Sequence, residues 1–322
     1  MKLLVAGLVL ITFSGVALLW RNGLDRVEKA PAVAAGPERT TRCMVWKAER
    51  GKATVWICGS IHLLRETDYP LPEPYLHAFS EAKTLVMEHD RTREGQGRQD
   101  AQQAAALPKG ETLEKKVSPE TWTAFSDWCR RSGTDLNTMQ PLKAWSAATF
   151  ITLINLQHLG YSAGLGMENY FVSSLAARKT AGLETLQEQL AVFDRLDAKT
   201  QENMILQAIA EEKNLKARSA AMAAAWHEGN ATLLSSLMEK NMHEFPDLKK
   251  RLQDDRNLAW IPKIEALLDG QETVMILAGS GHLAGSGSVI DLLEKKGVKV
   301  TQMEYKTTRP LIPSAGNTPE KP

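Results

Sequence analysis

A short apolar run that ends in a glycine-rich turn and a histidine constrains the fold of this chain more than any other feature. Residues 274–278 (Val-Met-Ile-Leu-Ala) are apolar without interruption, which is typical of a strand buried on both faces of a sheet. The run continues into Gly279-Ser-Gly-His282, and a helix-like segment follows at 289–296. A strand, a glycine turn and a helix in this order indicate an open α/β sheet, in which ligands bind outside the carboxyl ends of the strands.

The same arrangement occurs a second time, close to the amino-terminal end of the chain. A β-type run of residues 55–58 leads into Gly59-Ser-Ile-His62, so that both runs end in Gly-x-x-His. A third apolar run, Thr-Leu-Val-Met, ends directly at Glu88. If these strands share one sheet with their carboxyl ends at the same edge, His62, Glu88 and His282 converge on one site.

Two imidazoles and one carboxylate form a mixed nitrogen and oxygen ligand set. Such a set suits a divalent transition metal, with Mn, Co or Zn as the candidates, and leaves a coordination position open. A metal in such a site acidifies a bound water molecule or polarises a carbonyl group. We therefore predict that His62, Glu88 and His282 are metal ligands, and the alternative for each histidine is an ordinary turn residue after a glycine.

Three further polar residues are candidates for catalysis around this metal: Glu184, Arg256 and Asn257. A spare carboxylate can act as a general base, and an arginine can stabilise an oxyanion. The alternative interpretations are structural. Glu184 and Glu168 can be acidic residues at helix amino termini, and Arg256 can be a surface or salt-bridging helix residue.

The overall composition excludes several classes of protein. The net charge is +1 and no basic stripe with interleaved aromatic residues occurs, so no nucleic-acid partner is expected. Three cysteines are too few for a disulfide-rich scaffold or a zinc ribbon. The sequence also lacks the Gly-x-Ser-x-Gly, His-Glu-x-x-His and Walker motifs, so a serine hydrolase or a zincin of the usual kind lacks its signature. The remaining histidines are not spaced from another candidate ligand in a way that indicates a site, and we predict no functional role for them: His77, His89, His158, His227 and His243.

The amino-terminal residues are predicted to target the chain rather than to join the fold. Residues 3–20 carry no charge and, at ~1.5 Å per residue, reach ~27 Å as a helix, close to the ~30 Å hydrocarbon core of a bilayer. We predict that residues 1–28 form a membrane anchor or a signal peptide, and that 29–41 form an Ala/Pro-rich linker. The protein is therefore expected to be anchored in the inner membrane facing the periplasm, or to be secreted into the periplasm. Residues 306–322 are predicted to be a disordered tail.

Between these ends, in residues 42–305, the sequence predicts a mixed fold of helices and strands, α/β (α+β). Its central β-sheet is expected to be built from amino- and carboxyl-terminal segments, with a large helical insertion at about 118–245. Ser118-Pro119 marks the start of this insertion, because serine is a frequent helix N-cap and proline is tolerated at the first helical position.

The first part of this domain, residues 42–58, reads as a β-hairpin. With Arg50-Gly51 as a two-residue turn, Cys43 lies opposite Cys58. The two thiols then either form a disulfide, which needs an oxidising compartment, or remain as buried free cysteines.

Several of these motifs together resemble the TraB/GumN family, which is related to the TIKI metalloproteases and to the erythromycin esterase/ChaN-like fold. The resemblance covers residues 43–303, and one departure is Glu168, where an aspartate is expected more often. The motifs that carry the resemblance are Cys58-Gly-Ser-Ile-His62-Leu, Leu85-Val-Met-Glu88, Gly182-Leu-Glu-Thr-Leu-Gln-Glu-Gln-Leu190, Asp255-Arg-Asn-Leu-Ala-Trp260 and Gly279-Ser-Gly-His-Leu-Ala-Gly285.

The resemblance implies an α/β core with an inserted helical region, in which the two Gly-x-x-His loops and the glutamate form the active centre. It also implies a metal-dependent hydrolase, peptidase-like as in the TIKI branch, that acts on a peptide or another small substrate. Two alternatives remain open. One is a non-catalytic protein that binds haem or a peptide in the same cleft. The other is a metal-free esterase-like hydrolase in which His62 acts as the general base.

Overall fold

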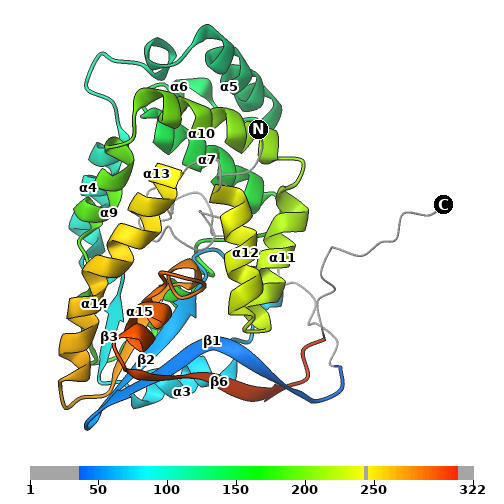
Figure 1. Cartoon of the computed structure of the whole chain (residues 1–322). Coiled ribbons are helices and arrows are strands. Elements are labelled where there is room, and N and C mark those ends of the chain that lie inside the picture. Colours follow the sequence, from blue (N-terminus) through cyan, green and yellow to red (C-terminus); the bar gives the residue numbers. More distant parts are fainter. Residues whose placement is uncertain (1–35, 243–245, 311–322) are drawn as a thin grey trace.

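The computed structural model describes residues 36–242 and 246–310 of the 322-residue chain (Figure 1). Its centre is a mixed sheet of six strands in the order β4-β3-β5-β2-β1-β6. Strands from both ends of the described chain share this sheet, which confirms the predicted α/β class. The strands are β1 (Arg39–Arg50), β2 (Ala53–Ser60), β3 (Thr84–Met87), β4 (Lys179–Gly182), β5 (Val274–Gly279) and β6 (Lys299–Thr307).

Strand β5, the apolar run before His282, lies at the centre of the sheet. It runs parallel to both of its neighbours, β3 and β2. All of its residues are buried, as expected for an apolar strand that is covered on both faces. Because β2, β3 and β5 are parallel, their carboxyl ends meet at one edge of the sheet, as predicted. Strands β1 and β6 complete the other side of the sheet as antiparallel neighbours.

The predicted hairpin forms, but its turn lies one residue later than expected. The strands pair with Val45 opposite Cys58, so the turn residues are Gly51 and Lys52. Gly51 has φ 62°, a left-handed conformation that glycine adopts without steric strain. The predicted pairing of Cys43 with Cys58 is therefore wrong, and both residues are buried free thiols.

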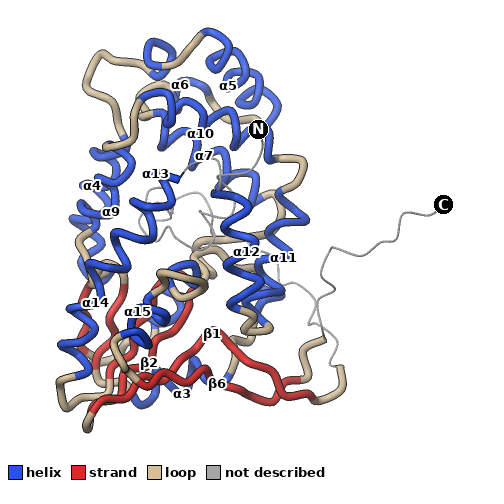
Figure 2. Tube along the Cα trace, in the orientation of Figure 1, coloured by secondary structure: helices blue, strands red, loops and turns tan. Residues whose placement is uncertain are grey.

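The chain between β3 and β5 is mostly helical. Figure 2 shows the strands gathered at one end of the molecule and helices filling the other end. The helices in this part are α4 (Glu94–Ala105), α5 (Pro119–Ser132), α6 (Leu136–Met139), α7 (Ala144–Gln157), α8 (Met167–Ser173), α9 (Leu186–Asp194), α10 (Ala198–Glu211), α11 (Leu215–His227), α12 (Ala231–Met242), α13 (Pro246–Lys249) and α14 (Asp255–Leu268). Two further helices, α3 (Glu73–Glu81) and α15 (Val289–Lys295), pack against the strands.

The last long helical segment of this region is interrupted before it reaches the sheet. A π-helical turn, η5 (Lys250–Asp254), joins α13 to α14. Such turns are frequent at functional sites, because they change which side chains face a neighbouring element. This turn directly precedes Arg256 and Asn257, which lie in the first turn of α14.

The predicted targeting segment, 1–28, lies outside the described residues, as does the predicted tail from residue 311 onward. The outer strands of the sheet extend beyond the predicted bounds of the domain, 42–305, at both ends. Strand β1 begins at Arg39, inside the predicted linker, and β6 continues to Thr307, inside the predicted tail. Among the residues that the structure describes, no helix combines the length and the apolar character that crossing a bilayer requires.

Candidate functional site

Three of the predicted residues lie at the carboxyl edge of the sheet. His62 follows β2 by two residues, and Glu88 is the first residue after β3. His282 ends a short 3-10 turn, η6 (Ser280–His282), which follows β5. All three are buried, with exposed fractions of 2 % or less. The parallel strands therefore bring together residues that are far apart in the sequence.

The ring of His62 is oriented by a glutamate from the helical region. Its Nδ1 lies 2.8 Å from Oε1 of Glu168, which also accepts a 2.5 Å hydrogen bond from the hydroxyl of Ser60. Burial alone would raise the pKa of Glu168, but the imidazole of His62 and the charge of Arg91 lower it to about 2. An ionised carboxylate only accepts hydrogen bonds, so the proton of the imidazole belongs on Nδ1.

This assignment leaves the Nε2 lone pair of His62 directed into the site. The Nε2 atom is buried and, within the described part of the chain, has no hydrogen-bond partner. It lies 3.9 Å from Oε1 of Glu88. A buried polar atom without a partner is rare, and one explanation is a ligand that completes it.

The ring of His282 is oriented in the same way by an amide. Asn257 donates from Nδ2 to the carbonyl of Gly287 at 2.9 Å, which fixes the direction of the amide. Its Oδ1 then accepts from Nδ1 of His282 at 2.7 Å. The Nε2 atom of His282 therefore carries the lone pair, and it accepts a 3.0 Å hydrogen bond from Nη1 of Arg256. Burial and the charge of Arg256 keep the pKa of His282 well below its usual value, so the ring is neutral.

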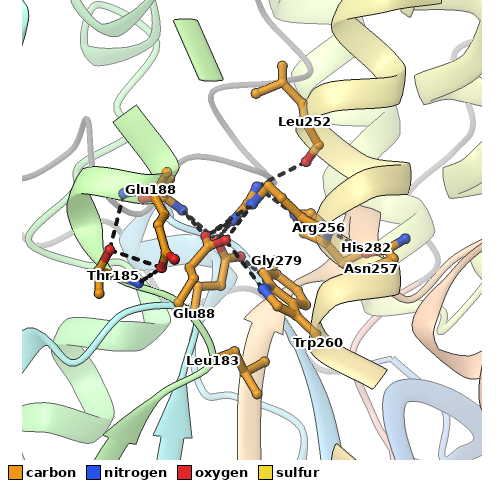
Figure 3. A network of polar contacts seen from close by, with 12 residues as sticks. Glu88, Leu183, Thr185, Glu188, Leu252, Arg256, Asn257, Trp260, Gly279 and His282 are labelled. Carbon is orange, nitrogen blue, oxygen red and sulfur yellow. Dashed lines mark hydrogen bonds and ion pairs between the residues drawn. The ribbon is translucent and has the colours of Figure 1, made fainter. Parts of the chain in front are cut away.

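Arg256 joins His282 to two buried carboxylates (Figure 3). Its Nη2 donates to Oε2 of Glu88 at 2.6 Å and to Oε1 of Glu184 at 2.5 Å. Its Nε donates to both oxygens of Glu184, at 3.0 and 3.1 Å. Burial raises the pKa of Glu184, and the guanidinium of Arg256 offsets this effect only in part.

Glu88 is held on both of its oxygens. The backbone N–H of Gly279, at the end of β5, donates to Oε1 at 2.7 Å. The side-chain amide of Gln189, in α9, donates to Oε2 at 2.8 Å. The carboxylate is thus fixed between two neighbouring strands and a helix.

The structure adds residues to this site beyond the predicted ligands and catalytic candidates. Glu168, which the resemblance made a less certain site member and which could also be a helix amino-terminal acid, orients His62. Gln189, which the sequence presented only as part of a longer motif, holds Glu88. His89, taken as ordinary, is also buried at this edge of the sheet. Burial and the charge of Arg91 lower its pKa to about 3. Its position directly after Glu88 was the signal that could have identified it.

His62, Glu88 and His282 are of residue types that bind metal ions, but their side chains are not arranged around one common point. Two imidazoles and one carboxylate are suitable ligands, and the buried Nε2 of His62, which has no hydrogen-bond partner among the described residues, is consistent with a ligand at this position. Among the described residues, however, no three His, Cys, Asp or Glu side chains are grouped closely enough to hold a metal as they stand. Arg256 contacts both Glu88 and His282 and takes up their facing atoms.

A pocket of about 490 Å³ lies beside the loop that leads into Glu168. The phenol of Tyr69 donates to the carbonyl of Leu165 in this loop at 2.6 Å. The ring of Tyr69 also contacts that of Tyr170, with the centroids 5.7 Å apart. The pocket is lined by Glu66, Tyr69, Gly164, Leu165, Asn169, Tyr170 and Ser173.

Comparison with known proteins identifies one similar group. The model of the TraB/PrgY/gumN family matches residues 44–302, from within β1 to within β6, a range that includes every site residue described above. Neither the curated proteins nor the solved structures contain a significant match.

Proposed function

Since the chain belongs to the TraB/PrgY/gumN family, we propose that its site is that of a metal-dependent hydrolase. The proposed metal ligands are His62, Glu88 and His282, and the metal is a divalent transition ion such as Mn, Co or Zn. The proposed substrate is a peptide or another small molecule that binds at the carboxyl edge of the sheet.

One observation carries this proposal: both histidines are fixed in the tautomer that a metal requires. Glu168 and Asn257 each accept a hydrogen bond from an Nδ1 atom, so that in both rings the lone pair belongs on Nε2; that of His62 has no hydrogen-bond partner among the described residues, and that of His282 accepts from Arg256. Ligating histidines usually donate their other ring N–H to a carboxylate or a carbonyl oxygen in this manner. Two separate elements, α8 and α14, supply these acceptors, so the match does not follow from one local motif.

A bound metal would acidify a water molecule or polarise a carbonyl group. The other side chains then have distinct roles. Glu184 is suited to accept a proton, because its raised pKa brings the carboxylate closer to neutral pH. Arg256 supplies a positive charge for a developing oxyanion. Asn257 contacts His282 rather than the open part of the site, so its role is to position that ring.

The test compares metal content and hydrolysis in His282→Ala and Glu88→Gln with the wild type. Each purified protein is incubated with Mn²⁺, Co²⁺ or Zn²⁺, and bound metal is measured by mass spectrometry. A peptide library then reports cleavage. We expect His282→Ala to lose most of its metal, and Glu88→Gln to bind more weakly and to lose hydrolysis.

The matched control is His227→Ala. His227 is a buried histidine that faces the carboxylate of Asp68, outside the site, with Nε2 and Oδ1 3.4 Å apart. It should keep its metal even if the protein becomes less stable. Equal metal content in the wild type and in His282→Ala, together with retained hydrolysis, would overturn the proposal.

The same geometry favours one alternative function. An imidazole that is oriented by a carboxylate and has a free Nε2, as in the pair of His62 and Glu168, can also act as a general base without a metal. Hydrolysis that persists in a chelator and is lost in His62→Ala would select this metal-free esterase-like enzyme. Binding of haem or a peptide without turnover would select the non-catalytic alternative.

We also propose that the domain acts outside the cytoplasm, exported or anchored by residues 1–28. The uncharged run at residues 3–20 supports this location. Fractionation of cells that express the full chain, or a chain that starts at residue 38, measures it. A shortened chain that stays with the membrane would contradict the anchor.

A further inference from the structure

The guanidinium of Arg256 already donates hydrogen bonds to two of the three proposed metal ligands, His282 and Glu88. Nη1 donates to Nε2 of His282 at 3.0 Å, and Nη2 donates to Oε2 of Glu88 at 2.6 Å. An imidazole whose Nδ1 carries a proton has a single lone pair, at Nε2. Because Nδ1 of His282 donates to Asn257, this lone pair cannot serve Arg256 and a metal at the same time.

We infer that Arg256 and the metal are alternative partners of His282 and Glu88. In the metal-free protein the guanidinium provides the positive charge that the buried carboxylates need. An incoming metal must displace it from both ligands. This inference rests on the proposed metal-dependent function and concerns how the site is loaded.

Glu184 provides the place to which Arg256 can withdraw. It accepts hydrogen bonds from Nε of Arg256 at 3.0 and 3.1 Å, and Nε is the guanidinium nitrogen nearest to the helix backbone. The far nitrogens can therefore leave His282 and Glu88 while Nε keeps its bonds to Glu184. The charge of Arg256 stays paired during this change, which matters because an unpaired buried charge is strongly unfavourable.

The hydrogen bonds of Arg256 indicate what the metal has to replace. The remaining hydrogen of Nη1 is donated to the carbonyl of Leu252 at 3.0 Å, so each of the three nitrogens has an acceptor. When a metal binds, Arg256 must give up its hydrogen bonds to His282 and Glu88 before it can form new ones. The metal affinity of the wild type is therefore expected to be lower than its ligand set alone would give.

The experiment measures the dissociation constants of Zn²⁺ and Mn²⁺ by isothermal titration calorimetry, at one fixed pH, for the wild type and Arg256→Gln. Glutamine removes the competing charge and cannot reach both ligands. We expect a dissociation constant at least 10-fold lower in Arg256→Gln. A wild type that binds no metal beside a variant that does would support the inference even more strongly.

Arg256→Lys is the matched control, since it keeps the positive charge but lacks the planar fork that donates to two partners at once. If competition for the lone pair is the cause, this variant also binds metal more tightly than the wild type. If only the loss of charge matters, Arg256→Lys binds no more tightly than the wild type, and the inference is overturned.

A spectroscopic measurement keeps the test valid if the variants fold poorly. In wild-type protein labelled with ¹⁵N at histidine and arginine, Zn²⁺ should shift the Nε2 resonance of His282 and the Nη resonances of Arg256 together. A shift at His282 without any change at Arg256 would contradict the displacement.

The possible results separate this inference from the proposed function. Metal binding that is equally tight in the wild type and in Arg256→Gln overturns the competition and leaves the metal-dependent hydrolase intact. Absence of metal binding in both proteins overturns both.

Discussion

At the scale of single residues, the site depends on side chains that orient other side chains. His62 and His282 were predictable from the sequence, because each follows a glycine at the end of an apolar strand. Glu168 and Gln189 were not, because they reach the site from helices whose placement depends on packing across the whole domain. No spacing in the sequence relates α8 or α9 to the end of β2 or β3.

The same limit applies to the position of Arg256. The sequence places it on a helix, but only the structure shows that it contacts a histidine and two glutamates at once. A surface or salt-bridging helix residue was the simpler expectation. An exposed fraction of 6 % excludes a surface position, whereas Arg256 does form salt bridges, to the buried carboxylates of Glu88 and Glu184.

Glu168→Gln tests whether the carboxylate beside His62 matters for the metal. Glutamine keeps the shape and can still accept from Nδ1, but it removes the charge that makes the imidazole a stronger ligand. We expect metal affinity to fall about 10- to 100-fold, the usual effect of losing such a partner. Glu188→Gln, in the exposed capping box of α9, is the control and should leave the metal affinity unchanged. Equal affinities in Glu168→Gln and the wild type would exclude the role.

At the scale of elements, the strands were predicted well and one turn was not. Continuous apolar runs identify β3 and β5, because both of their faces are buried and few other structures require such a run. The hairpin between β1 and β2 has alternating exposure only near its turn, so several registers satisfy the pattern. The positive φ of Gly51 selects the observed register, and a sequence does not state which residue of a turn has it.

The loop before α8 can lie close to the end of β2 because it has a glycine, Gly166, at the point of contact. A Cβ atom on Gly166 would overlap the carbonyl oxygen of His62, although the backbone of Gly166, with φ −60°, suits any residue. Gly166→Ala should therefore push His62 out of place. We expect a loss of about 1–3 kcal/mol in the free energy of unfolding and a lower metal affinity.

Gly160→Ala is the control for this prediction. Gly160 has φ 84° and no atoms within 4 Å of the added Cβ. It should lower stability by roughly 1–2 kcal/mol through backbone strain alone and leave the metal affinity intact. Chemical denaturation and calorimetry on both variants separate the effects, and identical metal affinities would show that Gly166 does not support the site.

Helices α5 and α10 are joined by Glu202. Its Oε1 accepts from the backbone N–H of Ser118 at 2.8 Å and from the hydroxyl of Thr121 at 2.6 Å. These hydrogen bonds lower the pKa of Glu202 to about 2 in the folded protein. The carboxylate therefore stabilises the fold above its unfolded pKa of about 4.3, and this contribution disappears as the pH falls toward about 2.

Glu202→Gln should accordingly be less stable than the wild type by about 1–3 kcal/mol at pH 7, and the difference should shrink below pH 4. Urea denaturation at pH 7 and pH 3 measures both values. A difference that does not change with pH would mean that the charge of Glu202 contributes nothing to this contact.

At the scale of the whole molecule, helices and the sheet are joined by buried hydrogen bonds. Trp226 in α11 donates from Nε1 to the carbonyl of Gly59 in β2 at 2.9 Å. The phenol of Tyr75 in α3 donates to the same carbonyl at 2.7 Å. The site itself takes side chains from β-strand ends and from three helices, α8, α9 and α14, so it exists only when both regions are folded.

Trp226→Phe should therefore lower the stability of the helices and the sheet together. The lost hydrogen bond and the smaller ring are expected to reduce the free energy of unfolding by about 2 kcal/mol. The reactivities of the thiols of Cys58 in β2 and Cys129 in α5 report the two regions separately, since both are buried. Both thiols should become reactive at the same, lowered urea concentration. A shift at only one of them would show that the regions unfold independently.

The order of the strands has a consequence for how the protein is made. The central strand of the sheet, β5, lies between β3 and β2, yet the ribosome completes it only at residue 279. Until then, the edges of β2 and β3 that will pair with β5 remain open, while almost the whole helical region has already been synthesised. Such distant pairing slows folding and exposes strand edges during synthesis. A nascent chain of this protein would therefore need a chaperone to cover those edges, and a stop codon before residue 274 would release an aggregation-prone fragment rather than a smaller folded domain.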